Sequence, residues 1–147
     1  LFGDHEVWPI KAIPLAVNTV QHPLPSARRC YKLGQALKVA IDSYPEDMKV
    51  VIAGTGGMSH QLQGERAGMI NVDYDLECIE SIINDPDWFA DQSTDHIMEQ
   101  AGTEGIETIM WMVMRGALGE KVNCLHKHYH APISNTGAGV LLLEGGA

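Results

Sequence analysis

The chain has 147 residues, of which 45% are hydrophobic, and its formal net charge is −9 at pH 7. This length is enough for one domain with a modest core. The acidic balance argues against nucleic-acid binding, because phosphate backbones favour basic surfaces, although a few local basic side chains could still bind an anionic small substrate. No apolar stretch approaches the roughly eighteen residues of a membrane span, so none is expected.

The first third of the chain predicts a strand, a helix and a second strand. Residues 10–20 are apolar and β-branched, with an interruption at Pro14, and indicate a strand. Ser26 is a typical helix cap, and the helix should extend to about Tyr44. Residues 48–53 indicate a short buried strand. This order favours a βαβ unit and therefore an α/β fold with a partial, mostly parallel sheet flanked by helices.

The remainder of the chain predicts a long loop followed by several helices. The loop, residues 54–68, contains several glycines and is too long to be a simple connector; such loops are often functional. Helices are expected at 73–84, at 86–89, from a Thr94 cap to Gly102, and from Thr103 through Arg115 to an end at Gly116. Residues 122–130 are ambiguous between helix and strand, and residues 140–143 indicate a last strand.

The cysteines and the first residues indicate the cellular compartment of the chain and whether it is part of a longer protein. Cys30, Cys78 and Cys124 are odd in number and widely spaced. They predict buried free thiols in a reducing cytoplasm. The chain begins at Leu1 instead of Met, and Leu1–Asp4 resembles the interior of a sequence, so we expect a fragment of a longer protein.

The loop carries the first candidate for chemistry, His60, in the segment Gly54–Gln61, which reads GTGGMSHQ. Ligands of open α/β sheets bind beyond the carboxyl ends of strands, and glycines let the backbone approach them. His60 would then be a proton carrier at the mouth of a pocket. The alternative is a tight turn with a surface histidine. The segment is neither a Walker loop nor the Gly-x-Ser-x-Gly of a nucleophile elbow.

The second candidate is Glu107, which precedes an almost wholly apolar helical segment. A helix that is apolar on every side is buried, so Glu107 is expected in the interior. A buried carboxylate needs a metal, a cation or hydrogen-bond donors. Metal ligation and a salt bridge to Arg115 or Arg66 both satisfy this need. Glu104 is expected to face solvent or to cap the helix.

The third candidate is a histidine triplet, His126, His128 and His130. On a strand these side chains would share a face and could bind a metal. No Cys, Asp or Glu lies within the run, which favours a solvated surface segment. The following turn, Ser134–Gly137, could line a pocket or only reverse the chain.

Several of these segments together resemble one known family. They are PSARRC at 25–30, GTGGMSHQLQGERAG at 54–68, GTEGIE at 102–107 with the helix after it, YH at 129–130 and SNT at 134–136. In this order, from about Trp8 to Leu143, the chain resembles class III extradiol ring-cleavage dioxygenases, of the protocatechuate 4,5-dioxygenase β-chain or gallate dioxygenase type.

The resemblance implies a non-haem Fe(II) enzyme that opens the ring of protocatechuate, gallate or a related catecholic acid with O₂. By the same resemblance, Glu107 corresponds to the carboxylate ligand of Fe(II) and His60 to a catalytic histidine beside the metal. Ser134 and Asn135 correspond to positions near the substrate. A carboxylate with two histidines leaves one face of the iron open for the diol and O₂.

The sequence also departs from the family's pattern. The two histidine ligands lie upstream of this chain, and His5 and His22 match neither ligand motif. We therefore expect residues 1–147 to be the C-terminal part of one catalytic domain, inactive alone and prone to associate through exposed sheet edges. A small partner subunit and a homo-oligomer are compatible with the resemblance. The rival readings are a degenerate, non-enzymatic module that kept the fold, and a hydrolase using Ser59 or His60.

Overall fold

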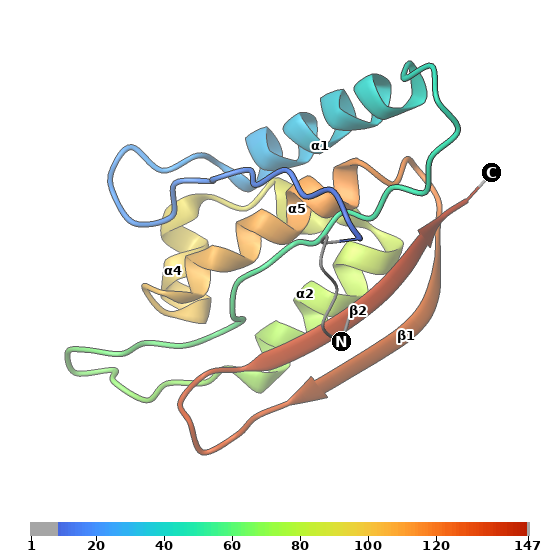
Figure 1. Cartoon of the computed structure of the whole chain (residues 1–147). Coiled ribbons are helices and arrows are strands. Elements are labelled where there is room, and N and C mark those ends of the chain that lie inside the picture. Colours follow the sequence, from blue (N-terminus) through green and yellow to red (C-terminus); the bar gives the residue numbers. More distant parts are fainter. Residues whose placement is uncertain (1–8, 147) are drawn as a thin grey trace.

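The computed structural model describes residues 9–146 (Figure 1). The chain forms helices on one side of a two-stranded antiparallel sheet, in which β1 (Val122–His130) pairs with β2 (Ala138–Gly145). The helical elements are α1 (Ala27–Asp42), α2 (Val72–Asn84), α3 (Pro86–Ala90), α4 (Thr94–Ala101), the 3₁₀ turn η1 (Gly105–Thr108) and α5 (Ile109–Gly116). Within residues 9–146, none of these helices has the length and apolar character needed to cross a membrane.

The parallel sheet expected from the sequence is absent from the described residues. Segments 10–20 and 48–53 form no ladder, and the side chains of Ile13 and Val51 are 94% and 80% exposed. A strand requires a neighbouring strand for its backbone hydrogen bonds, and residues 9–146 offer these two segments none. The α/β description therefore holds as a mixture of helices and a small sheet, and the prediction of a parallel βαβ unit is wrong for this part of the molecule.

The helix predictions hold with small shifts at the ends. The Ser26 hydroxyl accepts a hydrogen bond from Arg29 N at 3.2 Å, so α1 begins where its cap predicts, although it ends at Asp42. Ser93, one residue before the expected cap, accepts from His96 N at 3.1 Å and begins α4. A competing hydroxyl one position away explains this shift, because either residue can supply the capping oxygen.

The single helix predicted from Thr103 to Arg115 is divided into η1 and α5. Its first turn is packed tightly against neighbouring backbone, since a Cβ on Gly105 would lie 2.6 Å from Ala101 Cβ and 3.2 Å from Met58 O. This turn adopts the narrower 3₁₀ form, which is common at helix ends. Glu107 consequently lies in the 3₁₀ turn and not in α5.

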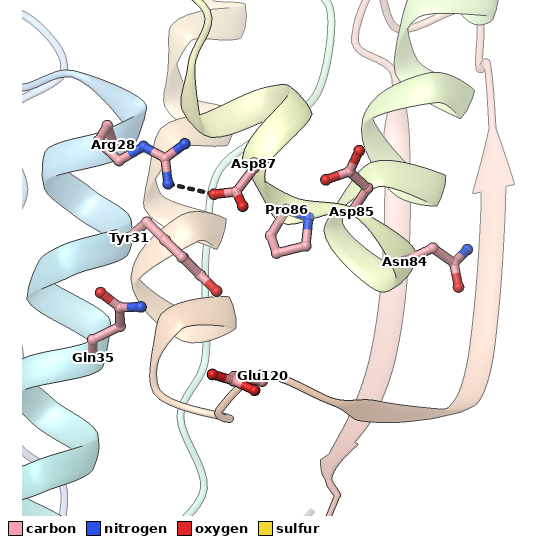
Figure 2. Close-up of a pocket in the computed structure, with 8 residues that line it drawn as sticks. All are labelled: Arg28, Tyr31, Gln35, Asn84, Asp85, Pro86, Asp87 and Glu120. Atoms are coloured by element: carbon pink, nitrogen blue, oxygen red, sulfur yellow. Dashed lines mark hydrogen bonds and ion pairs between the residues drawn. The ribbon is translucent and has the colours of Figure 1, made fainter.

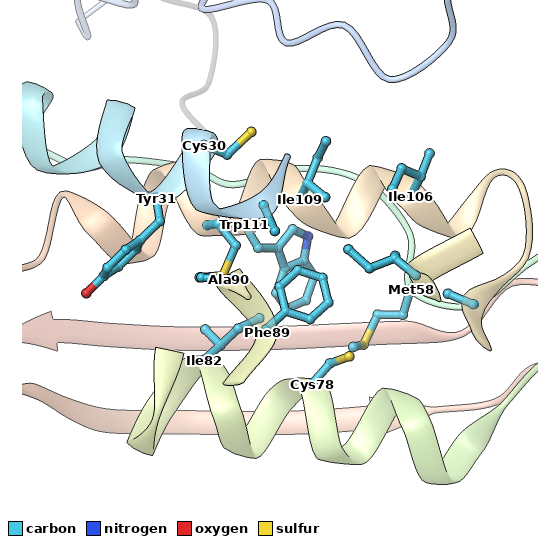
Figure 3. Packing of buried hydrophobic residues seen from close by; sticks show 14 of the residues in the cluster. Cys30, Tyr31, Met58, Cys78, Ile82, Phe89, Ala90, Ile106, Ile109 and Trp111 are labelled. Atoms are coloured by element: carbon cyan, nitrogen blue, oxygen red, sulfur yellow. The ribbon is translucent and has the colours of Figure 1, made fainter. Parts of the chain in front are cut away.

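The core lies between the helices and the inner face of the hairpin. Ile82, Phe89, Ile109 and Met112 are fully buried, and Figure 3 shows Ile82 and Phe89 near Trp111 in the interior. Burial of each large apolar side chain contributes about 1.5–3 kcal/mol. Figure 1 shows α1 beside α5.

Two glycines make the contact between α1 and α5 possible. A Cβ on Gly34 would lie 2.1 Å from Val113 O, and a Cβ on Gly116 would lie 2.1 Å from Tyr31 O. The two helix backbones therefore approach more closely than any larger side chain would permit at these positions.

The three cysteines are free, as predicted, but they are not all buried. Cys30 and Cys78 lie in the core, and burial raises the pKa of the Cys30 thiol to about 11. Cys124 is exposed on β1. Its strand position, not its residue type, decides this difference.

Candidate active site

The loop that contains His60 packs directly against η1 and α5. Gly57 N donates a hydrogen bond to Glu107 Oε2 at 3.2 Å, and Trp111 Nε1 donates to Gly56 O at 3.1 Å. Gly56 has φ 108°, and a Cβ there would lie 2.8 Å from Glu107 Cβ. A glycine is therefore required at this close approach. The structure thus brings the glycine loop and Glu107, 50 residues apart in the sequence, into contact.

His60 is held by its own loop and by the end of α4, and it is not a surface histidine. It is 7% exposed, its backbone N–H donates to Ala101 O at 2.7 Å, and its Nδ1 lies 2.8 Å from Met58 O. A carbonyl oxygen only accepts hydrogen bonds, so this contact assigns the proton to Nδ1 and leaves the lone pair on Nε2. The imidazole can accept a proton at Nε2. The alternative of a tight turn with a surface histidine is wrong.

Glu107 is half-buried, less enclosed than its apolar neighbours predict. Its Oε2 accepts the one hydrogen bond from Gly57, and neither of the two expected salt bridges forms among residues 9–146. Arg115 instead donates to the backbone oxygens of the α2 end and of residues 119–120, and Arg66 donates to Glu99 O. The carboxylate is thus not neutralised by a cation of the described residues.

Glu104 has a different role from Glu107, as the sequence suggests. Its Oε2 accepts from Thr103 Oγ1 at 2.7 Å and from Leu62 N at 3.2 Å. The Thr103 hydrogen bond lowers the pKa of the Glu104 carboxyl. Glu104 is partly exposed. Its contact with Leu62 N holds the loop just beyond His60.

Ser134 and Asn135 lie in the exposed turn between β1 and β2, beside the His60 loop. Thr136, the next residue, forms an isolated antiparallel bridge with His60. A Cβ on Gly68, at the end of the loop, would lie 3.4 Å from Asn135 Oδ1. The hairpin turn and the loop are therefore neighbours, and the four predicted site residues belong to one region of the molecule.

Asp75 is a buried acid of this region that the sequence interpretation misses. It is 1% exposed and accepts hydrogen bonds from Ser59 N at 2.9 Å, Ser59 Oγ at 2.7 Å and Tyr129 OH at 2.7 Å. Burial raises the pKa of its carboxyl, and the bonds from Ser59 and Tyr129 oppose that rise. A signal was present, because Asp75 lies on the helix face of Cys78, Ile79 and Ile82, all of them buried.

The hydrolase reading lacks an activated nucleophile. Ser59 is fully buried, its hydroxyl donates to Asp75, and it accepts from Asn71 N at 2.7 Å. The His60 ring contacts Met58 O, not the Ser59 hydroxyl. The Ser59 hydroxyl is therefore bound to a buried carboxylate instead of a histidine, and its full burial keeps it from reaching a substrate.

The histidine triplet lies on β1, which resolves the ambiguity of residues 122–130 in favour of a strand. His126, His128 and His130 are exposed, as expected for a solvated segment. Across residues 9–146, no group of three His, Cys, Asp or Glu side chains is placed to hold a metal ion.

A surface pocket of about 400 Å³ lies elsewhere, between α1 and the α2–α3 junction (Figure 2). It is lined in part by Arg28, Asp87 and Glu120. The Arg28 guanidinium forms ion pairs with Asp87 and Asp91, so its charge is already matched. None of the predicted site residues lines this pocket, and the chemistry-bearing groups lie around the His60 loop instead.

The comparisons with known proteins identify the family of the chain. Residues 2–141 match the family described as the catalytic LigB subunit of aromatic ring-opening dioxygenase. The chain belongs to this family. It is also 48% identical over 139 residues to a gallate dioxygenase of Pseudomonas putida, a match that covers 95% of this chain and 41% of that protein. The chain therefore spans about two fifths of the length of this curated relative, and the resemblance found in the sequence is confirmed.

Proposed function

We propose that this LigB-family chain is the C-terminal part of one catalytic domain of an Fe(II)-dependent extradiol dioxygenase. The substrate would be gallate, protocatechuate or a related catecholic acid, cleaved with O₂. The observation that supports the proposal is the hydrogen bond from Gly57 N to Glu107 Oε2, because it joins the loop that carries the enclosed His60 to a carboxylate that no cation of residues 9–146 neutralises. The relative named gallate dioxygenase supports the substrate class.

Glu107 is the residue of this chain that would hold the metal. Its carboxylate fits, since a half-buried anionic oxygen donor that pairs with no cation of residues 9–146 suits Fe(II). The remaining two ligands would be histidines from the rest of the proposed domain. When bound, the iron would act as a Lewis acid that lowers the pKa of the substrate hydroxyls, and it would supply coordination for the diol and O₂.

His60 would act as general base and then general acid. With Nδ1–H donated to Met58 O, the lone pair on Nε2 is available to take a proton from a substrate hydroxyl and later return it. Ser134 and Asn135, on the adjacent turn, would offer a hydroxyl and an amide to the polar groups of the substrate.

The rest of the domain would also complete the fold. Segments 10–20 and 48–53 would become strands of a mostly parallel sheet, and this pairing would cover Ile13 and Val51. The separate chain exposes these residues and should associate. We place the complete enzyme in the cytoplasm, with a small partner subunit or a second copy of the enzyme as further partners.

The test is O₂ consumption by the complete enzyme that contains this sequence, loaded with Fe(II). Gallate and protocatechuate should each be tested, with 4-hydroxybenzoate, which lacks the second adjacent hydroxyl, as control. We expect uptake of O₂ with at least one catecholic acid and none with the control. An iron-loaded enzyme inactive on both catecholic acids would favour the degenerate module instead.

A further inference from the structure

The Asp75 carboxyl is buried without a cationic partner among residues 9–146. Its three hydrogen-bond donors, two from Ser59 and one from Tyr129, are all neutral. No Lys or Arg of residues 9–146 forms a salt bridge with it. The surroundings are also shaped around the carboxylate, because a Cβ on Gly137 would lie 2.2 Å from Asp75 Oδ2. Buried carboxylates of this kind occur often at functional sites.

The decisive feature is the peptide group between Met58 and Ser59. Its N–H, from Ser59, donates to Asp75 Oδ1 at 2.9 Å, and its carbonyl, from Met58, accepts from His60 Nδ1 at 2.8 Å. A peptide unit is rigid and planar, so its N–H and C=O cannot turn independently. Asp75 therefore orients the same group that orients the imidazole of His60.

The backbone on both sides of this peptide group is bound by the hairpin. Met58 N donates to Gly137 O at 3.0 Å, and Ser59 O accepts from Gly137 N at 2.8 Å, so the hairpin holds both sides of the unit. Asp75 contributes charge as well as geometry. Hydrogen bonds in a chain polarise one another, and a carboxylate on the N–H makes the carbonyl at the other end a stronger acceptor.

We propose that Asp75 is a positioning residue that orients His60, and favours its Nδ1–H form, through the Met58–Ser59 peptide group. The inference rests on the proposed function, because only the proton transfer at His60 Nε2 gives this orientation a catalytic consequence. The carboxylate acts on the imidazole as in a carboxylate–histidine pair, with one peptide group interposed. Asp75 itself exchanges no proton with substrate.

A spectroscopic experiment tests the orientation without measuring activity. The complete, iron-free enzyme is labelled with ¹⁵N-histidine, and the His60 signals are assigned by their loss in His60→Ala. We expect a protonated Nδ1 and an unprotonated Nε2 in the parent enzyme, and a shift toward a mixture of both tautomers in Asp75→Asn. Tyr129→Phe is the matched control, because it removes one donor to Asp75 and keeps the Ser59 N–H contact. Its His60 signals should not change.

Two spectroscopic results would overturn the proposal. One is an unchanged His60 tautomer in a folded Asp75→Asn enzyme. The other is an Nε2–H tautomer in the parent enzyme, which would exclude the hydrogen bond from His60 Nδ1 to Met58 O. This second measurement does not depend on whether any variant folds. Thermal unfolding of each variant establishes that the fold is retained.

A double-mutant comparison tests the catalytic consequence. Asp75→Asn should lower kcat about tenfold when His60 is present, the scale of lost support for a functional histidine. In the His60→Ala background the same change should lower kcat less than twofold, because the group that Asp75 positions is gone. Equal losses in both backgrounds would make Asp75 a structural residue only. If Asp75→Asn leaves kcat unchanged while His60→Ala lowers it, the positioning role of Asp75 is wrong and the proposed function stands. If His60→Ala leaves kcat unchanged, both the proposed proton transfer and the positioning role are wrong.

Discussion

The His60 loop and the segments 10–20 and 48–53 are all irregular backbone, yet their surroundings differ. In the loop, the backbone groups of Gly57, Met58 and His60 are bound by η1, the hairpin and the end of α4. In the two segments, Ile13 and Val51 lie almost entirely in solvent. Irregular backbone is thus held in one conformation where neighbouring elements satisfy its polar groups, and the candidate site lies where this condition is met.

The largest effect is expected when this chain is separated from the rest of the proposed domain, which would supply partners for residues 10–20 and 48–53. The isolated 147-residue chain should bind Fe(II) weakly and show no ring cleavage, because Glu107 would supply only one of the three ligands that the resemblance implies. O₂ uptake with gallate and protocatechuate, measured beside the complete enzyme, checks this expectation. Turnover by the isolated chain would mean that the ligands we assign to the rest of the domain are not required.

Within the site, Glu107→Gln should abolish iron retention and with it turnover in the complete enzyme. A neutral amide is a poor ligand and also removes the charge that no cation of the described residues offsets. Glu104→Gln is the matched control, since Glu104 accepts hydrogen bonds from Thr103 and Leu62 and not from the Gly57 N–H. Iron per chain should fall only in the first variant, and equal losses would undo the assignment of Glu107.

His60→Ala should leave iron close to its original occupancy and lower turnover by about 10²–10⁴-fold, the usual contribution of a general acid–base group. The pH profile of turnover should also change near neutrality, because the proton acceptor is lost. Iron content and turnover across pH are the two measurements. Loss of iron would make His60 a ligand, and near-normal turnover would leave it without a catalytic role.

The contrast between packed and exposed regions predicts unequal effects on stability. Gly34→Ala should destabilise the fold by about 1–3 kcal/mol, because the new Cβ collides with Val113 O at the α1–α5 contact. In the isolated chain, Val51→Ser should change the free energy of unfolding by less than about 0.5 kcal/mol, as is usual at exposed positions. Urea unfolding of both variants measures the two changes in the free energy of unfolding, and equal changes would contradict the contrast. Val51→Ser should also reduce association of the isolated chain, which light scattering would detect.

The smallest effect concerns pH and Asp75. Burial raises the pKa of its carboxyl in the folded state, so the folded chain binds this proton more tightly than the unfolded chain. The favourable contribution of the protonated acid is present below the ordinary aspartate pKa of about 4, and is lost as pH rises through the higher folded value. Asp75→Asn should flatten this part of the stability–pH curve, measured by urea unfolding from acid to neutral pH. A parallel curve in the variant would contradict the shift.

The sequence by itself determined the family, the helices and four of the residues that now form one region. Caps such as Ser26 and the apolar spacing of α2 act locally, so they can be recognised without a fold. The sequence also predicted a catalytic role for His60 in its loop and separated Glu107 from Glu104. It did not reveal Asp75 as a partner of Ser59, although an acid on an apolar helix face was a visible signal.

Only the tertiary structure decided which groups meet. Gly57 contacts Glu107, which is 50 positions away in the sequence, and the Ser59 N–H of the Met58–Ser59 peptide group contacts Asp75, which is 16 positions away. No local pattern encodes such pairings. The same reason explains the errors at residues 10–20 and 48–53. Their composition favours strands, but a strand exists only when another strand pairs with it, and residues 9–146 provide no such partner.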